Sequence, residues 1–397
     1  MKTVQKCVNG RESVKGISKK HVFFYKLLRP PVILFLKATF GYRYKKAENL
    51  PENYIVISNH STDFDPLFVA ASFPEQMYFV GSEHIARWKT LYKLLKFAFE
   101  PIMRHKGASA GSAVMEMIKR VKKGASVCLF AEGVRTWDGS SSPIDPSTAK
   151  MIRRLGCGLV TYKIVGGYFA SPMWGGDSIR RGYVYGAPVH VFTKEQLSAM
   201  TNEELYEIIR EDLWEDAYAR QQTDPKKYRG RHLAKKLENL LFVCPQCGKR
   251  DTFHSAGDTA TCSACGLQVR YNEYGMLEGI PFRTAKELLD WQKEQVADDV
   301  EKNTVYTAGK ATLCSIKNHQ ETLAAEGAVE LSTESLKCGE IEIQLEEISE
   351  LSMRGQRAVL FTVGKTYYEL IPEAGFNALK FMLYFNEHRQ HMREKVG

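Results

Sequence analysis

The sequence lacks any long hydrophobic run. A helix that spans a membrane needs about 18 to 20 consecutive apolar residues, whereas the longest apolar run near the N-terminus covers residues 32–36. The beginning of the chain is basic but lacks the apolar core of about 7 to 15 residues that a secretory signal carries. These two absences argue against a transmembrane anchor and against export. We therefore expect a cytoplasmic protein that can lie on the face of a membrane without crossing it.

The pattern of the cysteines is not that of a disulfide framework. The chain has nine cysteines, an odd number, and four of them form two Cys-x-x-Cys pairs. Such pairs indicate metal binding in a reducing compartment. The other five are interpreted as ordinary thiols: Cys7, Cys128, Cys157, Cys314 and Cys338.

An acidic excess is also absent, and the positive charge is concentrated at one end. The formal net charge is +9, and residues 1–50 contain 12 Lys or Arg against 2 Glu, so the rest of the chain is nearly neutral. Within residues 22–29 and 32–37 the cations alternate with apolar clusters, a pattern that suits an interfacial segment on an anionic membrane. Nucleic acid is the competing partner, but so apolar a segment fits a bilayer surface better than a solvated phosphate groove. A basic tail followed by helices that pack on the protein's own core remains open.

Residues 51–222 carry the pattern of an α/β domain. Short apolar runs predict buried strands at residues 54–57, 77–80, 126–130 and 159–162. Between them, apolar residues at helical spacing predict a crossover helix over residues 112–122. Thr201 and Glu204 have the spacing of a capping box, which predicts a helix that closes the domain. We therefore expect a mixed sheet flanked by helices.

A small metal-binding module is expected after a basic linker at residues 223–242. Two Cys-x-x-Cys turns within residues 243–272 supply four thiolates, the arrangement of a tetrahedral structural zinc site. Since four sulfur ligands leave no coordination position for a substrate or water, the zinc is expected to support folding rather than catalysis. The four ligands of this zinc ribbon are Cys244, Cys247, Cys262 and Cys265.

The C-terminal third changes to a strand-rich pattern. Thr284 and Glu287 predict a cap for a connecting helix within residues 273–300. Residues 301–390 then show short alternating strands followed by one amphipathic helix. This order resembles a pleckstrin-homology-like or GRAM-type barrel, and an unrelated β-rich cap remains the alternative.

A histidine and an aspartate follow the first predicted strand. His60 and Asp65 belong to the segment Asn-His-Ser-Thr-Asp-Phe-Asp-Pro, and Pro66 is tolerated only in the first turn of a helix, so a helix should begin near Asp65. On one continuous helix the two side chains would point about 140° apart, whereas a loop-to-helix bend lets them meet. Asp65 would then fix the imidazole tautomer, and His60 would act as a general base toward a hydroxyl. The alternative is that Asp65 only caps the helix and His60 is a surface residue.

A second polar cluster follows the predicted strand that ends at Phe130. Glu132, Gly133 and Arg135 combine a carboxylate, a flexible glycine and a guanidinium that can grip a phosphate with two parallel hydrogen bonds. This combination predicts phosphate recognition. A structural ion pair between Glu132 and Arg135 is the alternative.

Together the two clusters resemble the lysophosphatidic acid acyltransferase family of glycerolipid acyltransferases, over about residues 25–215. The first motif of that family has the form Asn-His-x-Ser-x-x-Asp and the third has the form Phe-Pro-Glu-Gly-x-Arg. The positions that match the first, a weak second and the third motif are, in order, Asn59, His60 and Asp65; Ile102 and Arg104; and Phe130, Glu132, Gly133 and Arg135. Thr62 replaces the usual Ser and Ala131 the usual Pro, and these departures touch the binding of the acceptor more than the base.

The resemblance implies a reaction and a set of roles. His60 would deprotonate an acceptor hydroxyl, Asp65 would orient it, and the oxygen would attack an acyl thioester, with acyl-CoA or acyl carrier protein as the donor. The acceptor would be lysophosphatidic acid or a related lysophospholipid, and the product phosphatidic acid. The residues that would bind the substrate are Asn59, Arg104, Glu132, Gly133 and Arg135.

A noncatalytic scaffold is the rival interpretation. In it, the basic N-terminus and the zinc ribbon bind lipid or nucleic acid while the acyltransferase-like domain is inert. The intact His60 and Asp65 pair favours the enzyme. In either case the C-terminal modules could contact a protein partner.

Overall fold

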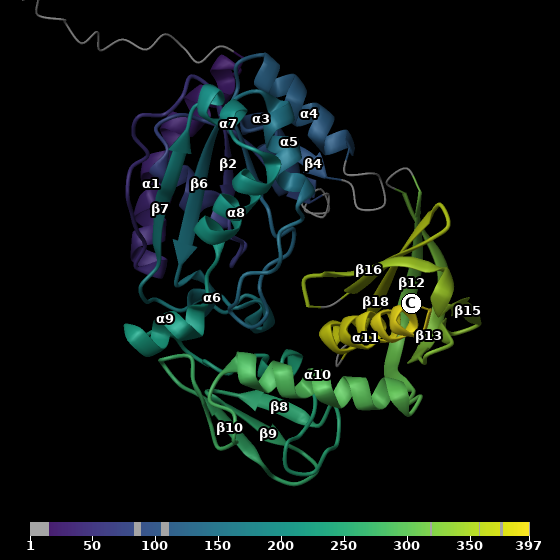
Figure 1. Ribbon diagram of the computed structural model, residues 1–397. Coiled ribbons are helices and arrows are strands. Elements are labelled where there is room, and N and C mark those ends of the chain that lie inside the picture. Colours follow the sequence, from purple (N-terminus) through teal and green to yellow (C-terminus); the bar gives the residue numbers. More distant parts are fainter. Residues whose placement is uncertain are drawn as a thin grey trace, which may run out of the picture.

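The computed structural model of the chain describes residues 16–82, 89–104, 111–317, 320–356, 358–373 and 376–396. These residues form three modules in chain order (Figure 1): a large α/β domain, a small green module with one long helix, and a yellow β-rich module that ends in a helix.

The first module is built on a seven-stranded mixed sheet. Its strands are β1 (Arg43–Tyr44), β2 (Tyr54–Ser58), β3 (Tyr78–Ser82), β4 (Ile102–Arg104), β5 (Val127–Phe130), β6 (Gly158–Val165) and β7 (Tyr185–Phe192). They lie in the order β1-β7-β6-β2-β5-β3-β4. All neighbours are parallel except β6 and β7, which are antiparallel. The predicted mixed sheet is therefore confirmed, and the four predicted strands correspond to β2, β3, β5 and β6.

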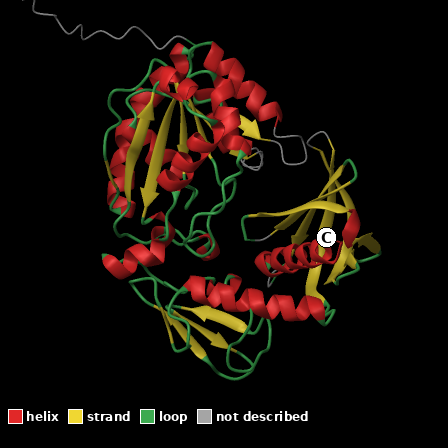
Figure 2. Ribbon diagram, viewed as in Figure 1, coloured by secondary structure: helices red, strands yellow, loops and turns green. Residues whose placement is uncertain are grey.

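Helices cover both faces of this sheet (Figure 2). They are α1 (Lys19–Phe40), α2 (Asp65–Ser72), α3 (Lys89–Ala98), α4 (Gly111–Lys122), α5 (Ser147–Leu155), α6 (Gly167–Ala170), α7 (Lys194–Ala199), α8 (Asn202–Leu213) and α9 (Ala217–Thr223). Side chains of β2 alternate between two separate cores, as a pleated strand requires: Val56 packs in the core that contains α1 and α2, whereas Ile55 and Ile57 pack in the core that contains α4, α5 and α8. The capping box of Thr201 and Glu204 begins α8, as predicted.

The first described helix, α1, faces two environments. Tyr25, Leu36 and Phe40 are buried against the domain, whereas Leu27 and Leu34 are 55% and 69% exposed. Part of the predicted interfacial segment therefore packs on the protein's own core, and part of it presents apolar side chains outward. In the part of the chain that the structure describes, no helix is both long enough and apolar enough to cross a membrane.

The second module is a four-stranded antiparallel sheet with one long helix. The strands β8 (Phe253–Ala256), β9 (Thr259–Cys262), β10 (Gln268–Tyr271) and β11 (Leu277–Glu278) lie in the order β11-β10-β9-β8. The helix α10 (Ala285–Glu301) begins at the predicted capping box of Thr284 and Glu287. The segment at residues 223–242, expected to be a polar linker, is instead well packed, because it carries several apolar side chains that are buried: Tyr228, Leu233, Ala234, Leu237, Leu240, Leu241 and Phe242.

The third module is a seven-stranded antiparallel sheet closed by the C-terminal helix. Its strands are β12 (Tyr306–Lys317), β13 (Gln320–Leu331), β14 (Ser335–Cys338), β15 (Ile341–Gln344), β16 (Ile348–Arg354), β17 (Ala358–Val363) and β18 (Thr366–Pro372), followed by α11 (Ala378–Val396). The order β15-β14-β13-β12-β18-β17-β16 brings the first strand of the module beside the last. This strongly curved sheet is compatible with the predicted barrel.

Specific polar contacts join the third module to the other two. Gln356, in the turn between β16 and β17, donates through Nε2 to the carbonyl oxygen of Met173 in the first module, and its Oε1 accepts from Asn239 at 3.0 Å. Lys380 of α11 forms an ion pair with Asp251 of the second module. The third module therefore packs against the other two modules through specific contacts.

Candidate active site

His60 and Asp65 meet at the bend between β2 and α2. The helix begins at Asp65, with Pro66 in its first turn, as the sequence predicts. Nδ1 of His60 lies 2.8 Å from Oδ2 of Asp65, and the His60 ring stacks on Phe130 at the end of β5. The His60 side chain is 20% exposed. Within the described ranges no residue hydrogen-bonds to Nε2 of His60.

Asp65 is fully buried, and its loop surrounds it with hydrogen-bond donors. Oδ2 accepts from the backbone N–H of Ser61 at 2.6 Å and of Thr62 at 2.9 Å, in addition to His60. Oδ1 accepts from the hydroxyls of Ser61 and Thr62 at 3.2 and 3.1 Å. A carboxylate that accepts this many hydrogen bonds is fixed in position. Asp65 therefore holds the loop before α2 and orients His60, whereas no side chain caps the start of α2. The hydrogen bonds that Ser61 and Thr62 donate to Asp65 were not predicted, although the spacing of Thr62 and Asp65 is close to that of a capping box.

Glu132 joins the two motifs through backbone groups. Its Oε1 accepts from the N–H of His60 at 2.8 Å, and its Oε2 accepts from the N–H of Ser142 at 2.6 Å. The carbonyl of His60 in turn accepts from the N–H of Thr136 at 3.2 Å. Burial, partly offset by these hydrogen bonds, raises the pKa of Glu132 to about 7. Both carboxylate oxygens are thus occupied by the protein's own backbone, and this side chain positions the loop that carries His60.

Asn59, like Glu132, holds the loop that follows β2 in position. Its side chain donates to the carbonyl of Ile164 and accepts from the N–H of the same residue, both at 2.8 Å. The side chain is buried. Asn59 therefore fixes the loop after β2 to β6, and the geometry does not point it toward a substrate.

Two arginines approach the same edge of the sheet. Arg135 is 11% exposed, and its Nη2 lies 3.2 Å from Oδ2 of Asp63. Its Nη1 is buried and has no hydrogen-bond partner among the described residues. Gly133 has a φ of 73°, and a Cβ at that position would lie 3.6 Å from Nη1 of Arg104, so Arg104 reaches from β4 to the same loop. A buried guanidinium nitrogen without a partner is the donor that an incoming anion needs.

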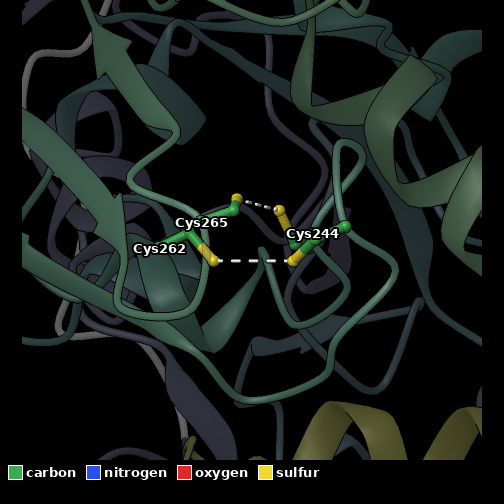
Figure 3. A group of neighbouring side chains, drawn as sticks. Cys244, Cys262 and Cys265 are labelled. Atoms are coloured by element: carbon green, nitrogen blue, oxygen red, sulfur yellow. Dashed lines mark hydrogen bonds between the residues drawn. The ribbon is translucent and has the colours of Figure 1, made fainter.

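The four predicted zinc ligands also come together, in the second module. Figure 3 shows the sulfur atoms of Cys244, Cys262 and Cys265 facing a common centre. Sγ of Cys244 lies 3.6 Å from Sγ of Cys265, and Sγ of Cys247 lies 3.9 Å from Sγ of Cys262. Four sulfurs around a zinc ion, each at about 2.3 Å, would lie about 3.8 Å apart. The spacing therefore fits a metal. The eight cysteines of the described residues form no disulfide, and Cys7 lies outside these residues.

Comparison with known proteins identifies the first module. Residues 41–165 match the family model described as Acyltransferase, and this range contains His60, Asp65, Arg104 and Arg135. No match was found among curated protein sequences. Among solved structures, the crystal structure of the 1-acyl-sn-glycerophosphate acyltransferase PlsC from Thermotoga maritima aligns over 49% of this chain and 76% of its own, with 20% identity and a TM-score of 0.38. The family match and the two motifs agree, and residues 41–165 form a domain of the acyltransferase family.

Proposed function

We propose that this chain moves a fatty acyl group from a thioester, either acyl-CoA or acyl carrier protein, to the hydroxyl of lysophosphatidic acid or a related lysophospholipid, giving phosphatidic acid. The observation that carries the proposal is the 2.8 Å contact between Nδ1 of His60 and Oδ2 of Asp65, beside the unpartnered Nη1 of Arg135. The contact between His60 and Asp65 supplies a general base, and Nη1 of Arg135 supplies a hydrogen-bond donor for the phosphate.

The reaction needs only one proton carrier. Nε2 of His60 takes the proton of the acceptor hydroxyl as the oxygen attacks the thioester carbonyl carbon. The new C–O bond forms, the C–S bond breaks, and the leaving thiolate recovers the proton from His60. The buried carboxylate of Asp65 stabilises the imidazolium that exists between these steps.

Arg104, Gly133 and Arg135 are proposed to hold the phosphate of the acceptor. The positive φ of Gly133 leaves room for the backbone to approach a ligand. Asn59 and Glu132, by contrast, are proposed as positioning residues, because their polar atoms are already engaged with backbone groups.

The test is acyl transfer by the purified full chain and by its His60→Ala variant. Both are incubated with acyl-CoA or acylated carrier protein and a panel of lysolipids, and the products are measured by mass spectrometry. Loss of the general base should lower the rate by roughly 10²- to 10⁴-fold. An unchanged rate would remove His60 from the mechanism, and no product from any acceptor with the unaltered chain would favour the noncatalytic scaffold.

We further propose that the protein works at the cytoplasmic face of an anionic membrane. The exposed apolar side chains of α1, including Leu27 and Leu34, support this, and Phe35 in the same helix contacts Phe64, next to Asp65. Each buried side chain of this size contributes about 1.5–3 kcal/mol. Vesicle sedimentation should therefore fall in a Leu27→Asn, Leu34→Asn variant and persist in Met115→Asn, which alters an equally exposed apolar side chain of α4. Equal binding by both variants would contradict docking through α1.

The appended modules are proposed as a structural zinc ribbon and a pleckstrin-homology-like or GRAM-type barrel that helps dock the enzyme to lipid or to a partner protein. The fourfold sulfur cluster supports the first assignment, and the position of α11 after the curved sheet supports the second. An experimental structure in which α11 leaves this sheet open would contradict the barrel.

A further inference from the structure

A basic hollow lies on the edge of the first module opposite His60. It has a volume of about 370 Å³ and lies between α5, α7 and the start of α8. Cys157, which precedes β6, forms part of its wall, whereas His60 follows the end of β2, which is parallel to β6. Five residues of β2 separate the two edges by roughly 17 Å at about 3.3 Å per residue. The hollow is therefore outside the proposed acyl-transfer site.

Four cations and no acidic residue line this hollow. Three come from one face of α5 and one from α7: Lys150, Arg153, Arg154 and Lys194. None of them forms an ion pair with a residue of the described chain. Other arginines of the same module do, since Arg120 pairs with Glu116 in α4 and Arg210 with Glu207 in α8. The four cations of the hollow thus stand outside the ion pairs of the described chain.

Helix stability alone does not account for this arrangement. Lys150, Arg153 and Arg154 are spaced three and four residues apart, so their charges repel along one helix face at a cost of about 0.2–0.5 kcal/mol for each pair. The position of Arg153 and Arg154 in the last turn of α5 favours cations. That explanation does not extend to Lys150, nor to Lys194, which is the first residue of α7 and lies at the end of a helix that disfavours a cation.

One of the cations is held in place. Nη1 of Arg153 donates to Oδ1 of Asn202, the first residue of α8, at 3.1 Å. The rest of its guanidinium fork remains available. Arginine forks bind phosphate oxygens in pairs, and lysine adds point charges. The volume lies within the range of about 300–1,000 Å³ that small-ligand pockets occupy.

We propose that this hollow binds the phosphoryl groups of a polyanion, carried either on a phosphorylated lipid headgroup or on a soluble polyphosphate. The ligand neutralises Lys150 and Lys194, which form no ion pair within the described chain, and it bridges α5 to α7. Binding at this edge is separate from acyl transfer, so turnover is not required to observe it.

The soluble source is tested with inorganic tripolyphosphate and the full chain, by calorimetry at physiological salt. A Lys150→Glu, Arg154→Glu variant should bind at least tenfold more weakly. A milder Lys150→Gln, Arg154→Gln variant keeps the test valid should charge reversal disturb α5. The matched control is Lys293→Glu, Lys302→Glu, which changes the net charge equally at two exposed lysines, one in α10 and one directly after it. Its affinity should stay within about twofold of the unaltered chain.

The lipid source is tested with phosphatidylcholine vesicles that contain or lack phosphatidic acid. A loss confined to tripolyphosphate supports a soluble ligand, a loss confined to phosphatidic acid vesicles supports a headgroup, and a loss of both supports shared phosphoryl recognition. The proposal is overturned if the unaltered chain binds neither probe, if the hollow variants bind both probes normally, or if the α10 control loses binding to the same extent.

Discussion

Nδ1 of His60 lies 2.8 Å from Oδ2 of Asp65, although the two residues are five positions apart. The contact exists because Pro66 forces α2 to begin where it does, which leaves His60 in the loop. The same Oδ2 accepts from the N–H groups of Ser61 and Thr62. One carboxylate therefore organises both the loop and the base.

Replacing Asp65 by Asn should lower both activity and stability. An amide has one acceptor oxygen in place of two and brings its own NH₂ against the donors of Ser61, Thr62 and His60. Since hydrogen bonds to a charged group contribute about 1.5–3 kcal/mol each, the free energy of unfolding should fall by at least about 2 kcal/mol. Denaturant unfolding measures this. His60→Ala is the matched control, and it should lose activity at nearly full stability. Equal stability of the two variants would show that Asp65 does not organise the loop.

Glu132 predicts a pH dependence of stability. Its pKa rises from an ordinary value of 4.5 to about 7, chiefly through burial. Because the folded chain holds this proton more tightly than the unfolded chain, Glu132 stabilises the fold fully below about pH 4.5, and this contribution is lost as the pH rises through about 7. The difference amounts to about 3 kcal/mol.

The comparison that isolates this effect is Glu132→Gln, which cannot ionise. Urea unfolding at about pH 5, 6.5 and 8 should show the unaltered chain losing stability relative to this variant as the pH rises. Glu294→Gln, at an exposed position of α10, should follow the unaltered chain at every pH. Parallel curves for Glu132→Gln and the unaltered chain would mean that Glu132 stays ionised throughout.

Arg135→Lys should weaken the binding of an acceptor that carries a phosphate. It should not change the binding of an acceptor that lacks one. A lysine keeps the charge but loses the planar fork that places Nη1 in its buried position. The loss of one charge-assisted hydrogen bond of about 1.5–3 kcal/mol predicts a KM for lysophosphatidic acid that is roughly 10- to 100-fold higher. Monoacylglycerol, which lacks the phosphate, should show no such change, and neither should the control Arg210→Lys on α8. A similar rise in KM for both acceptors would contradict a phosphate contact.

The parts of the site that could be predicted from the sequence are those encoded locally. His60, Asp65 and Pro66 lie within seven positions, and both the helix start and the bend follow from the chemistry of these residues. The roles of Asn59 and Glu132 could not be predicted. Asn59 bonds to backbone groups of Ile164, 105 positions away, and backbone groups carry no signature of residue type. The sequence therefore predicts that both residues bind the substrate, whereas in the structure their side chains connect loops.

The elements of the fold that could be predicted are likewise those encoded by a local sequence pattern. Buried strands such as β2 and β5 are continuous apolar runs and were predicted. Strand β7 could not be predicted, because Gly186 and Pro188 interrupt its apolar pattern. The proline is tolerated there because β7 lies near the edge of the sheet. The contact of Gln356 with the carbonyl of Met173 could likewise not be predicted from local sequence patterns, because it depends on how whole modules pack together.

Removal of zinc should loosen the second module first. Its four short strands depend on two turns whose cysteines converge, and a structural zinc site contributes an apparent 10–16 kcal/mol, roughly, to folding. The unaltered chain should contain one zinc ion by mass spectrometry under native conditions, and Cys262→Ser or a chelator should expose protease sites between residues 244 and 282. Gln246→Ala, an exposed change within the same turn that keeps all four sulfurs, should retain both the metal and the protease resistance. A chain without bound zinc, with the same protease pattern in both variants, would show that the four thiols do not hold a structural metal.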